Sequence, residues 1–75
     1  MNVSTEDIKA IKPGQIKPFP CEDARKMQSA ATMIGQLKRL DMPEGVADYE
    51  FQRFYEHNII LIHALREGEE KVLNR

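Results

Sequence analysis

The stretch from Glu22 to Leu40 constrains the fold of this chain more than any other segment, because it is the longest one with a single hydrophobic period. Its apolar residues recur three and four positions apart: Ala24, Met27, Ala30, Ala31, Ile34, Leu37 and Leu40. That spacing places them on one side of an α-helix. We therefore predict an amphipathic helix over residues 22–40 that packs on a core. Its small residues, Gly35 among them, are expected to let it lie close to a neighbouring element.

The other side of this helix carries an uncommon set of side chains. It combines cations with neutral hydrogen-bonding groups: Arg25, Lys26, Gln28, Ser29, Thr32, Gln36, Lys38 and Arg39. No acidic residue occurs between Asp23 and Asp41, whereas a solvated helix face usually mixes both signs of charge. The helix dipole favours cations in the last turn, but it does not explain Arg25 and Lys26 near the positive end.

The segment before this helix, residues 15–21, is expected to be extended. Pro18 and Pro20 lack an N–H and restrict their neighbours, so the segment fits only an edge strand or a polyproline-type conformation. Phe19 is its expected anchor in the core. At the start of the chain, Ser4 and Asp7 have the spacing of a capping box, which predicts a short helix to about residue 12, with a loose arm as the alternative.

The segment after the helix predicts a β-hairpin. Aromatic and β-branched residues are dense over 49–56 and 59–66, and His57-Asn58 is a plausible turn between them. Near-helical spacing of some hydrophobic residues leaves a helix over 46–66 as the alternative. Residues 67–75 read as a polar tail, with or without a short helix.

These elements predict a single α+β domain over residues 1–75. One main helix would cover one face of a small three-stranded sheet, and the residues expected to be buried are Phe19, Met27, Ile34, Leu37, Phe51, Ile60 and Ile62. An all-α arrangement of three helices is the alternative, and it follows from the helical interpretation of residues 46–66.

Composition bounds the location and the partners of the chain. Its 11 basic and 12 acidic residues give a net charge of −1, so no bulk field attracts it to nucleic acid or membrane. A lone Cys21 excludes an internal disulfide and fits a reducing compartment. The polar, acidic start does not resemble a signal peptide, and the apolar run at 59–65 is too short to cross a bilayer. We expect a cytoplasmic protein without a membrane partner.

Several short features together resemble a group of small proteins. Lys12-Pro13-Gly14, Phe19-Pro20, Ser29-Ala30, Lys38-Arg39, Ile60-Leu61-Ile62 and Arg66 follow one another in this order. In this overall pattern, over residues 9–66, the chain resembles uncharacterised β-α-β-β proteins encoded by phages and mobile elements of Bacteroides-type gut bacteria. The resemblance implies a genomic setting in which DNA-binding regulators and antagonists of host defence are both common.

No constellation in the sequence indicates an enzyme. His57 and His63 are six positions apart, which matches no zinc-site spacing, and Cys21 is far from both in sequence. The acidic residues are not paired with a nucleophile or a glycine-rich loop. We therefore expect no catalytic residues, no metal and no cofactor, and we expect His63 to be a core or interface histidine.

Two binding functions are consistent with these patterns. Arg, Gln, Ser and Thr side chains contact phosphates and base edges, so the polar helix side predicts binding of double-stranded DNA by a small regulator. An ordinary solvated helix face is the alternative explanation of that side. The aromatic residues of the hairpin, Tyr49, Phe51, Phe54 and Tyr55, indicate a protein interface instead, with a host protein or with a second copy in a homodimer.

Overall fold

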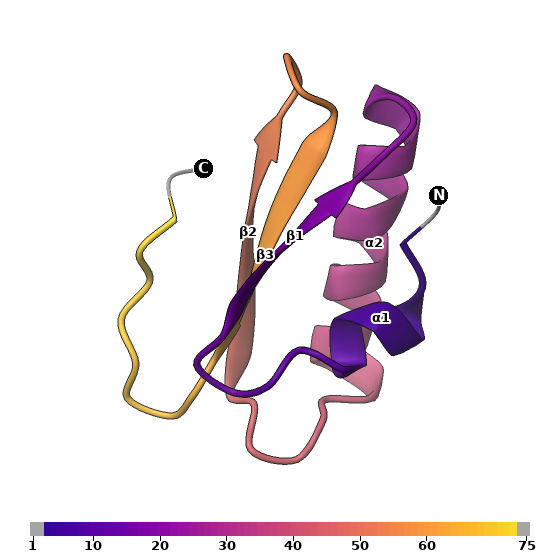
Figure 1. The fold of residues 1–75 in the computed structure, drawn as a ribbon. Helices are drawn as coiled ribbons and strands as arrows, with labels where there is room; N and C mark the ends of the chain where they lie inside the picture. The colour runs from indigo at the N-terminus through magenta and orange to yellow at the C-terminus, as the bar shows by residue number, and fades with distance from the viewer. Residues whose placement is uncertain (1–2, 74–75) are drawn as a thin grey trace.

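The computed structural model describes residues 3–73 and shows two helices and three strands (Figure 1). In chain order they are α1 (Thr5–Lys9), β1 (Ile16–Pro20), α2 (Ala24–Leu40), β2 (Asp48–Phe54) and β3 (Ile59–Leu65). The strands form one antiparallel sheet in the order β1-β3-β2, and α2 covers one of its faces. The predicted α+β fold is confirmed and the all-α alternative is wrong. Those parts of the predicted arm and tail that fall on residues 1, 2, 74 and 75 lie outside the described residues.

The helix α2 begins two residues later than predicted, because Asp23 is its N-cap. The backbone at Asp23 is extended, and its carboxylate accepts a hydrogen bond from the Lys26 N–H at 3.0 Å. The residues that α2 buries are Met27, Ala30, Ile34 and Leu37, which confirms the apolar side of the predicted helix. Leu40 is 81% exposed, since it ends the helix beyond its contact with the sheet.

The short helix α1 contributes to the core despite its five residues. The predicted capping box is present, with Ser4 and Asp7 each accepting a hydrogen bond from the backbone N–H of the other. The helix ends at Lys9, three residues earlier than predicted. Ile8 and Ile11 are fully buried in the cluster that also contains the apolar side of α2, so this region is not a loose arm.

The hairpin of β2 and β3 turns through residues 55–58. Asn58 has a φ of 52°, a left-handed conformation that asparagine tolerates better than most residues. Phe54 therefore pairs with Ile59, and the register continues to Asp48 opposite Leu65. The predicted two-residue turn at His57-Asn58 is wrong, and the strand pairing differs accordingly.

The register sorts the side chains of the sheet onto two faces, because directly paired residues point to the same side. Tyr49, Ile60, Ile62 and Ala64 lie on the face covered by α2, and all are fully buried. Phe51 and Phe19 share this face but are only half-buried at its periphery. We call the opposite side the open face; its members are Ile16, Pro18, Pro20, Asp48, Glu50, Gln52, Phe54, Ile59, Leu61, His63 and Leu65.

Gly35 does not serve the close packing expected from the sequence. A Cβ atom built at this position would meet no other atom within 4 Å, whereas the fully buried Ala30 does contribute to the core. No neighbouring element of the described chain therefore requires glycine at position 35.

We expect Gly35→Ala to raise the free energy of unfolding by about 0.5–1 kcal/mol, since alanine is the better helix former and has room here. Gly14→Ala is the matched control. Gly14 has a φ of +88°, and a Cβ there would lie 3.0 Å from Arg66 Nε, so this substitution should destabilise the protein. Urea denaturation of both variants measures whether each substitution raises or lowers the free energy of unfolding. A loss of stability in Gly35→Ala would contradict the conclusion that a Cβ atom has room at this position.

Candidate functional sites

The exposed side of α2 brings together six of the eight residues predicted to bind nucleic acid. Arg25, Gln28, Ser29, Thr32, Gln36 and Arg39 are all exposed, and together they are called the polar face of α2. At 3.6 residues per turn they span roughly 100° of the helix circumference. No carboxylate belongs to this face.

The two arginines of the polar face have no ion pair within residues 3–73, which leaves both guanidinium groups available to a ligand. The acidic residues at the two ends of α2 are occupied: Asp23 caps the helix, and Asp41 is paired with Lys9. The face is therefore cationic although the whole chain is not.

The two lysines of the predicted site lie on the flanks of the helix. Lys26 is half-buried, and Lys38 forms an ion pair of 3.0 Å with Asp48 at the start of β2. Burial raises the pKa of the Asp48 carboxyl, but the hydrogen bonds from Lys38 and the Tyr49 N–H, with the charge of Lys71, leave that pKa below its ordinary value. Lys38 thus ties α2 to the sheet.

The hydroxyl groups of the polar face are already in use as donors. Ser29 Oγ donates to the Arg25 carbonyl, and Thr32 Oγ1 donates to the Gln28 carbonyl, each at 3.1 Å. These oxygens can still accept hydrogen bonds. The amides of Gln28 and Gln36 are therefore the neutral groups of this face that can both donate and accept.

The four aromatic residues predicted to form an interface do not share one surface. Tyr49 is fully buried in the core, so it cannot contact a partner, and within the described chain its hydroxyl has no hydrogen-bond partner. Phe51 packs against the core on the same face, whereas Phe54 lies half-buried on the open face. Only Tyr55, at the turn, is largely exposed. Alternation along β2 separates them.

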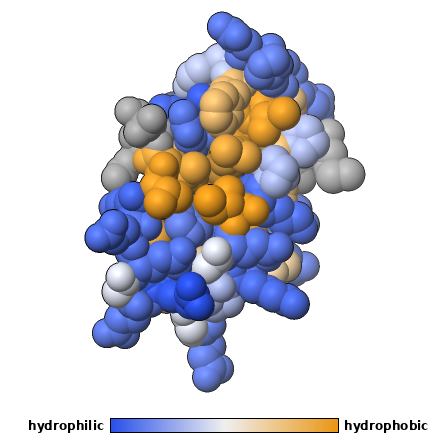
Figure 2. Space-filling model, turned by 60° about the vertical axis from the view of Figure 1, so that its left-hand side comes forward, coloured by the Kyte–Doolittle hydropathy of each residue, from blue (hydrophilic) through white to orange (hydrophobic). Residues whose placement is uncertain are grey.

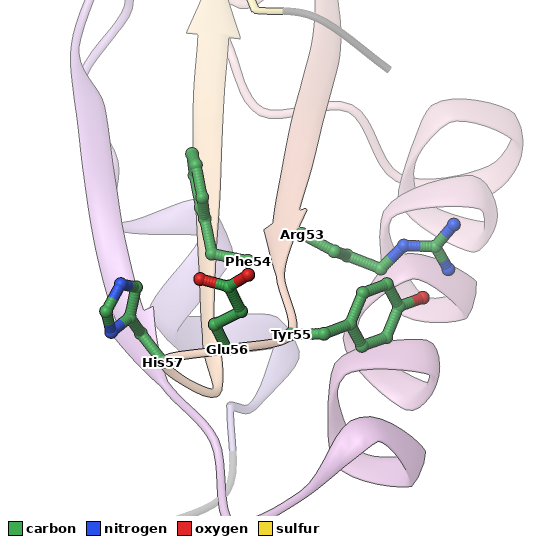
Figure 3. A pocket seen from close by; sticks show the side chains of 5 residues that line it. All are labelled: Arg53, Phe54, Tyr55, Glu56 and His57. Atoms are coloured by element: carbon green, nitrogen blue, oxygen red, sulfur yellow. The ribbon is translucent and has the colours of Figure 1, made fainter.

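The tip of the hairpin forms a hollow of about 410 Å³ lined by Arg53, Phe54, Tyr55, Glu56 and His57. The Arg53 guanidinium carbon lies 5.7 Å from the ring centroids of both Phe51 and Tyr55, which fixes its position by cation–π contacts. In Figure 3 Arg53 and Tyr55 point toward α2, while His57 points the opposite way. The lining side chains diverge, so they do not surround a single ligand.

A buried ionic cluster lies on the open face. His63 is 2% exposed and Glu50 is 1% exposed; Nδ1 of His63 lies 2.7 Å from Glu50 Oε2, and Nε2 lies 3.0 Å from Glu69 Oε2. Each ring nitrogen of His63 therefore has a carboxylate oxygen at hydrogen-bond distance. The burial of His63 agrees with the expectation of a core or interface histidine.

The Glu50 carboxylate also accepts two consecutive backbone N–H groups, from Val72 at 2.9 Å and Leu73 at 3.1 Å. Burial raises the pKa of Glu50, but these two bonds and the hydrogen bond with His63 outweigh burial and leave the pKa below its ordinary value. The Arg66 N–H, followed by His63, likewise lowers the pKa of Glu69. Both carboxylates are thus held in the ionised form.

The sequence did not predict this cluster, because the two-residue turn expected at 57–58 would pair Glu50 with Leu65. The observed turn of residues 55–58 pairs Glu50 with His63. The histidine in the otherwise apolar β3 was the available signal. Within residues 3–73, no group of three or more His, Cys, Asp or Glu residues could hold a metal ion.

Comparisons with known proteins leave function to be inferred from these side chains. No family model matches the chain, and no curated protein or solved structure shows significant similarity to it. A helix with the length and apolar character needed to cross a bilayer is absent from residues 3–73.

Proposed function

We propose that the protein binds double-stranded DNA through the polar face of α2, as a small regulator. The observation that carries this proposal is a 17-residue helix whose outer side has two glutamines, two arginines without an ion pair in the described residues 3–73, and no carboxylate. An α-helix fits the major groove of B-DNA, where arginine pairs with guanine and glutamine with adenine.

The spacing along α2 suggests how the contacts would divide. Arg25 and Arg39 are 14 residues apart, roughly 21 Å at 1.5 Å per residue, so they can contact phosphates at both sides of a groove about 12 Å wide. Gln28 and Gln36 lie between them and would face the base edges. Ser29 and Thr32 would accept hydrogen bonds or contact a thymine methyl group.

Charges outside α2 support the same orientation. Arg53 shares a sheet face with Ile60, the face on which α2 packs, and its side chain is exposed. The strongly acidic stretch, Glu67 to Glu70, lies in the segment over the open face, on the opposite side of the sheet. A duplex docked on α2 would therefore avoid the acidic stretch from Glu67 to Glu70.

We expect the double variant Arg25→Ala/Arg39→Ala to bind a DNA duplex at least about tenfold more weakly than the wild type, with a salt dependence shallower by about two charges. Mobility-shift titrations at several salt concentrations measure both quantities. The matched control is Arg66→Ala/Lys71→Ala, which removes the same charge from the other side of the sheet and should change binding little.

Two results would contradict the proposal. One is no retardation of duplex DNA by tens of micromolar protein at about 50 mM salt, where even non-specific binding is detectable. The other is equal weakening by the two double variants, since that would show a dependence on net charge and not on the polar face.

A further inference from the structure

Residues 66–73, which we call segment 66–73, run across the open face and not away from it. Figure 1 shows this segment on the side of the sheet opposite α2. It contains no helix and adds no strand to the sheet. Its fixed points are side-chain contacts: Glu69 on His63, the backbone N–H groups of Val72 and Leu73 on Glu50, and Lys71 at 3.6 Å from Asp48.

These contacts recognise backbone and charge more than side-chain shape. The Glu50 carboxylate accepts two successive N–H groups, which the chain offers to one acceptor because it bends at residue 73. Any peptide without proline at these two positions can adopt this bend, since only backbone groups are involved. The Val72 side chain itself is 64% exposed, so it contributes little to the fit. Nε2 of His63 lies 3.0 Å from Glu69 Oε2, so a carboxylate is the group that segment 66–73 presents to this nitrogen.

The open face also has apolar surface that segment 66–73 leaves exposed. Ile16 is 40% exposed, and Phe54, Ile59 and Leu61 are half-buried. Figure 2, which brings this side of the molecule forward, shows hydrophobic side chains gathered in a patch with hydrophilic ones around it. A longer or better-placed peptide would bury this patch and gain affinity that the internal segment does not use.

We propose that the open face binds a peptide segment of another protein that adopts the backbone course of residues 66–73, and that segment 66–73 occupies this surface as a displaceable internal ligand. The partner segment carries an acidic residue that meets His63, followed three positions later by two N–H groups that meet Glu50, with apolar side chains directed at Ile16 and Leu61. This surface lies on the far side of the sheet from α2, so the proposal does not depend on DNA binding.

Because segment 66–73 is covalently attached to the domain, a free peptide must compete with its high effective concentration to displace it. A tethered segment competes at an effective concentration of about a millimolar, so a free peptide with the same contacts binds the wild type weakly. Glu69→Gln weakens the internal ligand and leaves Glu50 and His63 in place. Val72→Pro does so independently, because it removes one of the two N–H groups and changes an exposed side chain.

The test is an NMR titration of the isotope-labelled full chain with a capped peptide of sequence EGEEKVL, which corresponds to residues 67–73. In Glu69→Gln and in Val72→Pro we expect the peptide to shift the amide signals beside Glu50 and His63 with an apparent affinity about tenfold higher than in the wild type. A peptide with glutamine at the position of Glu69 should bind about tenfold more weakly, because a neutral amide forms a weaker hydrogen bond with His63 than the Glu69 carboxylate does.

Three outcomes would overturn the proposal. The first is that both variants remain folded by circular dichroism but fail to respond to millimolar peptide. The second is equal binding of the acidic and the glutamine peptides. The third is self-association of the variants by exchange of segment 66–73, seen in sedimentation without any effect of peptide, which would identify a second copy as the occupant.

Discussion

Glu50→Ala is expected to lower the free energy of unfolding by about 3 kcal/mol, the low end of the cost of breaking a buried ion pair. The substitution removes the acceptor of His63 Nδ1 and leaves the N–H groups of Val72 and Leu73 without their partner. Release of segment 66–73 would let water reach the His63 ring, which limits the loss. Even so, it is a large part of the stability of a domain of this size.

Urea denaturation measures this loss, and Glu70→Ala provides the matched control. Glu70 is an exposed carboxylate of segment 66–73, and its removal should change stability by no more than about 0.5 kcal/mol. Equal effects of the two substitutions would show that the buried cluster has no special energetic role.

A second variant separates the contribution of the buried cluster to stability from its role in positioning segment 66–73. Replacing a buried ion pair by apolar residues of similar volume is often neutral or stabilising. Glu50→Leu/His63→Leu should therefore recover most of the stability that Glu50→Ala loses, while Val72 and Leu73 lose their fixed position. Such a result would indicate that the cluster holds segment 66–73 in place and that an apolar pair could equally support the sheet, in line with a surface that recognises backbone N–H groups.

The extent to which the sequence predicts this structure differs between its parts. The helix α2 was predictable because its apolar period runs through the whole segment and four of its positions are fully buried. The strands of the hairpin were predictable from composition, but their pairing was not. The pairing depends on where the turn lies, and in this turn Asn58 adopts the left-handed conformation. Relative to the predicted register the strand pairing is displaced by two residues, so that His63 and not Leu65 lies opposite Glu50.

The role of segment 66–73 had no local signal at all. Its composition is that of a solvated tail, and its contacts with Glu50 join residues 22 and 23 positions apart through backbone N–H groups, which every non-proline residue has. A histidine in an otherwise apolar strand, such as His63 in β3, predicts that a polar partner exists, but it does not say which part of the chain supplies that partner. In the same way, the polar face of α2 was predictable as a set, whereas the ion pair of Lys38 with Asp48 required the fold.

Acid is expected to destabilise the protein mainly through this same cluster. The pKa values of Glu50 and Glu69 are lowered in the folded protein, so their contribution to stability is fully present above the ordinary glutamate pKa of about 4.3 and is lost as pH falls through the lower, folded values. Asp7 and Asp48, whose pKa values are also lowered, add to this loss. The groups that face His63 are Glu50 from β2 and Glu69 from segment 66–73, while its neighbour on β1, Ile16, does not titrate.

Denaturation curves of the wild type and Glu50→Gln as a function of pH measure this effect. The variant should be less stable at neutral pH, and its stability should fall less steeply below about pH 4.3, because glutamine has no proton to gain. The amides of Val72 and Leu73, corrected for intrinsic exchange rates, should lose hydrogen-exchange protection before the strands do, since segment 66–73 is attached to the sheet through the titrating carboxylates. Identical pH profiles for the two proteins would mean that protonation of Glu50 does not control the acid sensitivity. Earlier loss of protection in segment 66–73 than in the sheet would instead show that the open face can be uncovered while the domain remains folded, which is the condition for a competing peptide to bind there.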